Sequence, residues 1–103
     1  MKNKDNAIVG IYKITNPINE VYIGQSTNMK NRKSYYKSTR AKGQPKICNS
    51  IKTHGWENHV FEVIEECSLS ILDIKEEHHK ISYIIHNGWN KALFCRLKDG
   101  RGV

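Results

Sequence analysis

The feature that most constrains the fold of this chain is a strand–turn–strand–helix pattern near its N-terminal end. Residues 7–15 are rich in β-branched and aromatic side chains, the tetrapeptide NPIN at 16–19 has the composition of a turn, and residues 20–24 form a returning strand. The polar run QSTN at 25–28 supplies N-cap residues for a helix that we expect to reach about residue 42. This hairpin would bring Tyr12 and Tyr22 together, with Arg32 reaching them from the helix. Cross-strand packing of the two aromatic rings is the alternative interpretation.

The rest of the chain predicts a single small domain. Pro45 is placed to begin a short helix that ends near His54, residues 60–66 indicate a third strand, and residues 68–86 indicate a long last helix. Residues 91–96 are a candidate edge strand. The order β-β-α-α-β-α over residues 1–103 predicts an α+β fold, in which helices flank a small three-stranded antiparallel or mixed sheet.

Composition limits where such a protein can work. The 103 residues are 38% hydrophobic, and no apolar run approaches the roughly 20 residues that a membrane span needs. The first ten residues lack the apolar stretch of a signal peptide. We therefore expect no membrane and an intracellular location, in the cytoplasm or on the nucleoid.

The spacing of the cysteines and histidines argues against a fold that is held together by a structural metal ion or by disulfide bonds. Cys48, Cys67 and Cys95 are odd in number and widely separated, so reduced thiols are expected. The five histidines form no recognised zinc-binding spacing. A zinc-stabilised adaptor remains a third hypothesis, and it predicts stoichiometric zinc in the purified protein.

Charge is distributed unevenly along the chain. The formal net charge is +7, and no acidic residue occurs between Glu20 and Glu57. That interval contains eight basic residues: Lys30, Arg32, Lys33, Lys37, Arg40, Lys42, Lys46 and Lys52. Such a block predicts a face that binds a polyanion, above all nucleic-acid phosphate, whereas a solvated helix surface is the simpler alternative.

The last helix carries a carboxylate of interest. A helical projection of residues 68–86 places Glu77 within an arc of isoleucines (Ile71, Ile74, Ile81, Ile84 and Ile85) and turns Glu76 outward. A carboxylate inside an apolar arc is costly unless it is paired or binds a metal. One carboxylate is enough for Mg²⁺, which keeps several of its waters.

Taken together, the tripeptides GIY at 10–12 and YIG at 22–24, followed by Arg32 ten residues after the second tyrosine, resemble the GIY-YIG nuclease family. The resemblance continues more loosely through residues 46–55, Glu77 and Asn90, and so covers about residues 7–93. Over residues 46–55 it is similar to the nuclease domains of intron-encoded homing endonucleases.

The resemblance implies a metal-dependent endonuclease that hydrolyses DNA phosphodiester bonds with one Mg²⁺ or Mn²⁺ ion. It implies that Tyr12 acts as general base or positions the attacking water, and that Tyr22 orients water and phosphate. Arg32 would stabilise the transition state, and Glu77 would hold the metal. The positions with an architectural role at the site would be Gly10, Gly24 and Asn90.

DNA is the expected partner. Residues predicted to contact it are Lys30, Lys33, Tyr36, Lys37, Arg40 and Lys46. Tyr36 departs from the family pattern, because many members have a histidine at that position. Since homing endonucleases usually append a recognition module, either a homodimer or a separate DNA-recognition module is a further expected partner. The alternative function is a non-catalytic nucleic-acid-binding module that retains the nuclease fold.

Overall fold

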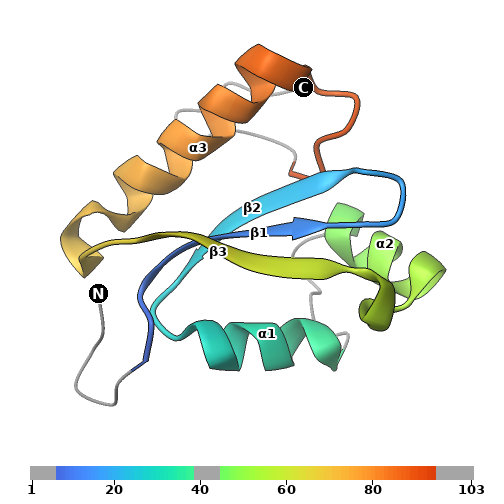
Figure 1. The fold of residues 1–103 in the computed structure, drawn as a ribbon, viewed down its shortest axis with the longest axis horizontal. Helices are drawn as coiled ribbons and strands as arrows, with labels where there is room; N and C mark the ends of the chain where they lie inside the picture. Colours follow the sequence, from blue (N-terminus) through green and yellow to red (C-terminus); the bar gives the residue numbers. More distant parts are fainter. Residues whose placement is uncertain (1–6, 39–44, 95–103) are drawn as a thin grey trace.

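The computed structural model describes residues 7–38 and 45–94 as an α+β fold with the predicted order of elements (Figure 1). The strands are β1 (Gly10–Thr15), β2 (Val21–Ser26) and β3 (Val60–Glu66). The helices are α1 (Met29–Lys37), α2 (Pro45–His54) and α3 (Leu72–Asn87). Short 3-10 turns at Trp56–Asn58 and Leu69–Ile71 precede β3 and α3 respectively.

The three strands form one antiparallel sheet with the order β2-β1-β3. In the β1–β2 hairpin, Tyr12 lies opposite Gly24 and Ile14 lies opposite Tyr22. The turn is closed by Asn16, whose Oδ1 accepts hydrogen bonds from the backbone N–H of residues 18 and 20 at 3.1 and 2.8 Å. This side-chain mimic of a backbone turn explains why the NPIN sequence reverses the chain here.

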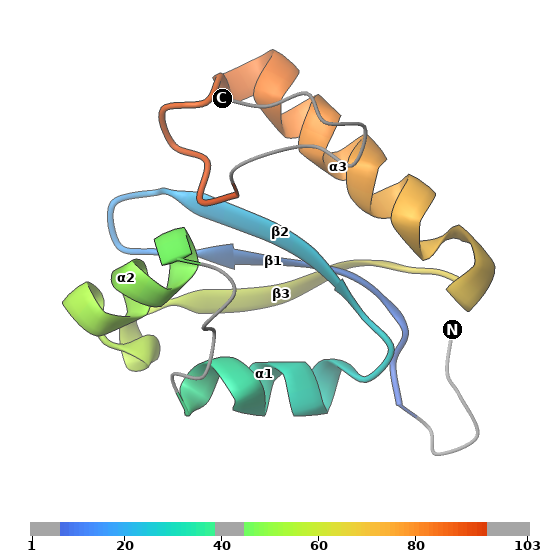
Figure 2. The ribbon, with the colours of Figure 1, turned by 180° about the vertical axis from the view of Figure 1, so that it is seen from behind.

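Helices cover both faces of the sheet. α1 and α2 lie on one face and α3 lies on the other (Figures 1 and 2). The core is correspondingly divided into two clusters. The cluster on the α3 side contains Val9, Ile11, Val21, Ile23, Cys67, Leu72, Ala92 and Phe94. The cluster on the α1–α2 side contains Tyr12, Ile14, Met29, Tyr36, Ile47, Ile51 and Leu93.

Element boundaries differ from the predicted ones mainly at the helices. α1 ends at Lys37, because Ser38 caps it, and the rest of the predicted extension falls largely outside the described residues. The predicted N-cap chemistry is confirmed, since Asn28 Oδ1 accepts from the Asn31 N–H at 3.1 Å. α3 begins at Leu72 rather than residue 68, after the 3-10 turn.

The candidate edge strand at 91–96 is reduced to a single parallel bridge within the described residues. Val21 pairs with Ala92, the Val21 N–H donates to Lys91 O, and the Leu93 N–H donates to Val21 O, both at 2.7 Å. These bonds tie the segment that follows α3 to the start of β2. Within residues 7–38 and 45–94, no helix is long and apolar enough to cross a membrane.

Candidate active site

Three tyrosines meet on the α1 side of the hairpin. The Tyr12 and Tyr36 hydroxyls are hydrogen-bonded at 2.7 Å, and Tyr22 is a further hydrogen-bond partner of Tyr36. The three ring centroids lie 6.0 to 6.2 Å from one another. Tyr12 and Tyr36 are 1% and 0% exposed, whereas Tyr22 is half-buried. The predicted pairing of Tyr12 and Tyr22 is therefore present, with Tyr36 as a third member.

Two glycines leave the space that this arrangement needs. A Cβ atom at Gly24 would lie 2.5 Å from the Tyr12 hydroxyl and 3.0 Å from the Tyr22 ring. A Cβ atom at Gly10 would collide with the backbone carbonyl of Glu65, where β1 and β3 pack closely. The Tyr12 ring therefore packs directly against Gly24, and the absence of a side chain at Gly10 lets β3 approach β1 closely.

The electrostatics of the cluster involve one arginine and one glutamate. Burial is the main cause that raises the pKa of Tyr12, Tyr22 and Tyr36 far above the usual 10.0. The Glu76 carboxylate raises the pKa of Tyr12 and Tyr22 further, while the Arg32 guanidinium lowers it. All three phenols are therefore neutral at pH 7; Arg32 acts on all three, and Glu76 acts on Tyr12 and Tyr22.

Arg32 lies on α1 beside open space, in cavities that none of the three clustered tyrosines lines. Its guanidinium carbon is 5.0 Å from the centroid of the Tyr35 ring, and the side chain is half-buried. It lines two open cavities, of about 390 and 350 Å³. The second of these reaches from residues 25–27 at the end of β2 to Leu72 and Asp73 at the start of α3. A ligand in either cavity could therefore meet the guanidinium.

The carboxylate that faces the sheet is Glu76, so the helical projection of α3 was wrong. Glu76 is 7% exposed, and its Oε2 is 2.8 Å from the Lys80 Nζ, which is buried as well. Glu77 is half-buried. The helix is rotated so that Leu72, Glu76 and Lys80 face inward, which leaves two of the isoleucines of the predicted arc, Ile74 and Ile85, 68% and 74% exposed.

The predicted DNA contacts divide into three groups. Lys30, Lys33 and Lys37 are exposed on α1, and Lys46 is exposed at the start of α2. Arg40 lies outside the described residues. Tyr36 was wrongly assigned, because a fully buried ring stacked on Trp56 (centroids 5.9 Å apart) cannot contact DNA.

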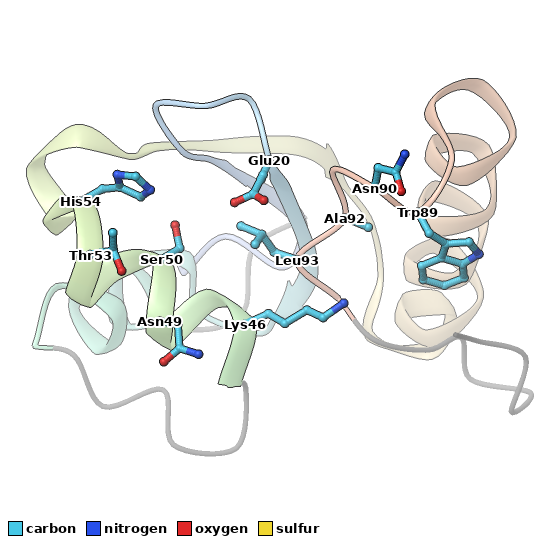
Figure 3. Close-up of a pocket in the computed structure, with 10 residues that line it drawn as sticks. All are labelled: Glu20, Lys46, Asn49, Ser50, Thr53, His54, Trp89, Asn90, Ala92 and Leu93. Atoms are coloured by element: carbon cyan, nitrogen blue, oxygen red, sulfur yellow. The ribbon is translucent and has the colours of Figure 1, made fainter.

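Asn90 was expected at the site and lies elsewhere. It lines a separate cavity of about 370 Å³, together with Lys46, His54 and Trp89 (Figure 3). None of the three tyrosines lines that cavity. Ser50 also lines this cavity, and its Oγ accepts a hydrogen bond from the side-chain amide of Asn16 at 2.9 Å.

His59 is held in a structural network and not at the tyrosine cluster. Its Nδ1 donates to the Gly55 carbonyl at 2.8 Å, which leaves Nε2 to accept from the Ser50 hydroxyl at 2.8 Å. The ring also stacks on Trp56, with centroids 5.9 Å apart. Both ring nitrogens are thus engaged, and the network joins α2 to the hairpin turn through Asn16.

The carboxylate that acts on the pKa of Tyr12 and Tyr22 is that of Glu76. Among the described residues, no group of three or more His, Cys, Asp or Glu side chains could hold a metal. Glu76 is a buried carboxylate paired with Lys80, and carboxylate oxygens are the donors that Mg²⁺ and Mn²⁺ take.

No family model matches this chain, and neither a curated protein nor a solved structure matches it significantly. Function is therefore inferred from the residues and their geometry.

Proposed function

We propose that this protein is a divalent-metal-dependent endonuclease of the GIY-YIG type that hydrolyses phosphodiester bonds in DNA. What supports the proposal is the pairing of Tyr12 and Tyr22 on adjacent strands, together with the effect of Arg32 on α1 and Glu76 on α3 on the pKa of both phenols. Core packing has no need for a guanidinium and a carboxylate that both act on the same phenols. Phosphodiester hydrolysis needs such groups to hold the phosphate and the attacking water.

Arg32 is the residue that would bind the scissile phosphate. Its planar guanidinium stays protonated and can donate two parallel hydrogen bonds to phosphate oxygens. Its position at the wall of two open cavities leaves it reachable for substrate. As negative charge develops on the phosphate in the transition state, this fixed cation would stabilise it.

The tyrosines would position water and not remove its proton. Their raised pKa values keep the phenols neutral, and a neutral phenol is a poor base at pH 7. The hydrogen bond between Tyr12 and Tyr36 fixes the orientation of the Tyr12 hydroxyl. A water bound to that hydroxyl would therefore be held in a fixed direction. Mg²⁺ or Mn²⁺ held by Glu76 would supply positive charge to the phosphate oxygens.

The DNA backbone would lie along α1. The exposed ammonium groups of Lys30, Lys33 and Lys37 stand on the same helix as Arg32. Contacts of this kind hold phosphates without reading sequence, so cleavage by this domain should have little sequence preference.

A plasmid-nicking assay with Mg²⁺, with Mn²⁺ and with EDTA tests the proposal. Arg32→Ala and Glu76→Gln should each lower the rate by about 10²-fold or more, which is typical for loss of one charge-stabilising group. Glu77→Gln is the matched control, because it removes the same charge from the adjacent position, and it should cut at nearly the parental rate. Equal losses in the two glutamine variants would remove Glu76 from the proposed site.

One observation favours the second candidate, a nucleic-acid-binding module without catalysis. Lys80 neutralises the carboxylate of Glu76, which weakens the repulsion between that carboxylate and a phosphate. This candidate predicts DNA binding that depends on salt and on the α1 lysines, with no plasmid conversion in either metal. Metal-dependent nicking that is lost in Glu76→Gln would exclude it.

A further inference from the structure

The cavity that Asn90 lines is a cleft between α2 and the segment 89–93 (Figure 3). Its α2 side is a polar helix face whose members recur at helical spacing: Lys46, Asn49, Ser50, Thr53 and His54. The adjacent face of α2 carries Ile47 and Ile51, which pack in the core. Because the polar face lines a cleft of about 370 Å³, its side chains can surround a polar ligand.

Hydrogen bonds hold the parts of this cleft in place. The segment 89–93 is tied to Val21 of β2 by two backbone hydrogen bonds of 2.7 Å. Asn16, which is 3% exposed, joins the hairpin to α2, because its side-chain amide donates to Glu20 Oε1 at 2.7 Å and to Ser50 Oγ at 2.9 Å. The position of the Glu20 carboxylate relative to α2 is therefore set before any ligand binds.

Two charged side chains of the cleft have their charge available to a ligand. Glu20 is half-buried, and Lys46 is exposed at the start of α2. In the part of the chain that the structure describes, neither of them forms an ion pair. A carboxylate is stabilised by hydrogen-bond donors, and an ammonium group attracts an anion. The cleft therefore suits a ligand that presents donors at one end and negative charge at the other.

A nucleotide whose base has an exocyclic amino group presents this combination. We propose that the cleft binds one such nucleotide of DNA, with the amino group donating to Glu20 and the phosphate bound by Lys46. Cytosine offers this amino group to a carboxylate, whereas thymine has a carbonyl oxygen at the same position. The side-chain amides of Asn49 and Asn90 can donate to or accept from the rest of the base edge. The volume of the cleft suits a single nucleotide.

This role is distinct from the proposed cleavage chemistry. The inference rests on the proposed function only in taking DNA as the partner, since none of the three clustered tyrosines lines the cleft. The lysines on α1 hold phosphates without reading bases. Glu20 would add a base preference at one position of the bound strand.

A titration followed by NMR, with dCMP and dUMP as probes, tests the proposal. The two nucleotides differ only in the amino or carbonyl group of the base. The side-chain amide signals of Asn49 and Asn90 report on the cleft, whereas those of Asn28 and Asn31 report on a cavity that Arg32 lines. We expect dCMP to shift the signals of Asn49 and Asn90 and to bind there about tenfold more tightly than dUMP.

Two variants assign the contacts, each with a matched control. Glu20→Gln keeps an oxygen that can accept from Asn16, and it should bring the ratio of the two affinities to about one. Glu57→Gln, at an exposed position outside the cleft, should keep the parental ratio. Lys46→Met should weaken both nucleotides equally, because a phosphate contact does not distinguish bases. Lys52→Met, on the same helix but outside the cleft, should leave both affinities unchanged.

Three outcomes would overturn the proposal: equal affinities for dCMP and dUMP in the parent, shifts confined to Asn28 and Asn31, or inorganic phosphate binding in the cleft as tightly as dCMP. These comparisons need only the parent protein, so they decide the matter even if Glu20→Gln does not fold. The plasmid-nicking assay separates the cleft from the nuclease. A preference for dCMP in a protein that does not nick DNA would remove the nuclease and leave the cleft, and nicking by a protein without that preference would do the reverse.

Discussion

Gly24→Ala is the substitution that tests the site geometry most directly. The added Cβ would lie 2.5 Å from the Tyr12 hydroxyl and 2.6 Å from the ring carbon that bears it. Both distances are well below van der Waals contact, so either the Tyr12 ring or the β2 backbone must shift. The ring has little room, because Tyr12 is 1% exposed and stacks on Phe61 with centroids 5.0 Å apart.

The expected cost follows from two opposing terms. Overpacking of a close-packed core costs about 1–3 kcal/mol. Alanine is preferred over glycine within a strand by roughly 0.5–1 kcal/mol, which offsets part of this. Gly24→Ala should therefore lower the free energy of unfolding by about 1–2 kcal/mol, and urea denaturation should show a midpoint lower by about 1 M.

A double-mutant cycle assigns this loss to Tyr12. Tyr12→Leu removes the outer part of the ring, so Gly24→Ala should cost little in that background, with a coupling energy of about 1 kcal/mol or more. Gly88→Ala is the control: Gly88 has a φ of 75° and nothing within 4 Å of the added Cβ. It should cost about 1–3 kcal/mol through backbone strain alone, equally in both backgrounds. A coupling energy below about 0.5 kcal/mol for Gly24 would refute the placement of Tyr12 over this glycine.

Three further predictions concern the buried polar groups. Tyr36→Phe removes the hydroxyl that bonds to Tyr12 and should lower the free energy of unfolding by about 1–3 kcal/mol in urea denaturation; an unchanged midpoint would contradict the bond. Ser50→Ala leaves Nε2 of His59 without its donor and should cost a similar amount, about 1–3 kcal/mol, whereas Ser82→Ala at a half-buried position of α3 should cost less. Because the folded-state pKa values of Tyr12, Tyr22 and Tyr36 are raised above 10.0, the stability that these groups contribute is present below pH 10.0 and is lost as the pH rises above it. An absorbance titration at alkaline pH should show these phenols ionising only as the protein unfolds, and early ionisation of all five tyrosines in the folded protein would count against it.

Local sequence signals were sufficient for the sheet. The NPIN turn fixes the hairpin, and the third strand was predicted with the observed bounds, Val60–Glu66. The turn and the strand depend on residues that are adjacent in the sequence. The order of the strands and helices then decides the α+β class. The ends of the helices were less predictable, because α1 is capped by Ser38 before the expected end at about residue 42, and a 3-10 turn takes the place of the first turn of α3.

The rotation of α3 could not be predicted from apolar periodicity. Isoleucines at 74 and 85 suggested a buried face that the structure exposes. The inward face contains Glu76 and Lys80 instead, and each makes the burial of the other tolerable. Their i, i+4 spacing, on the same face as Leu72, was the signal available in the sequence, and it is equally typical of solvent-exposed helices.

Tyr36 shows a second limit of sequence reasoning. The basic residues around it suggested contact with DNA. Only the tertiary structure brings its hydroxyl to Tyr12, which is 24 positions earlier in the chain. Contacts at such separations are set by how the helix packs on the sheet.

The outer edge of β3 has a consequence for solubility. β3 pairs with β1 on one side, and no other described strand covers its second side. An open edge of this kind can recruit the same strand of another molecule and start a growing β-assembly. Here Glu62 and Glu66 are exposed on that strand, and its valines at 60 and 63 are 55% and 39% exposed. The carboxylates must lose water before a second strand can dock beside the valines, so they protect the molecule from aggregation through this strand edge.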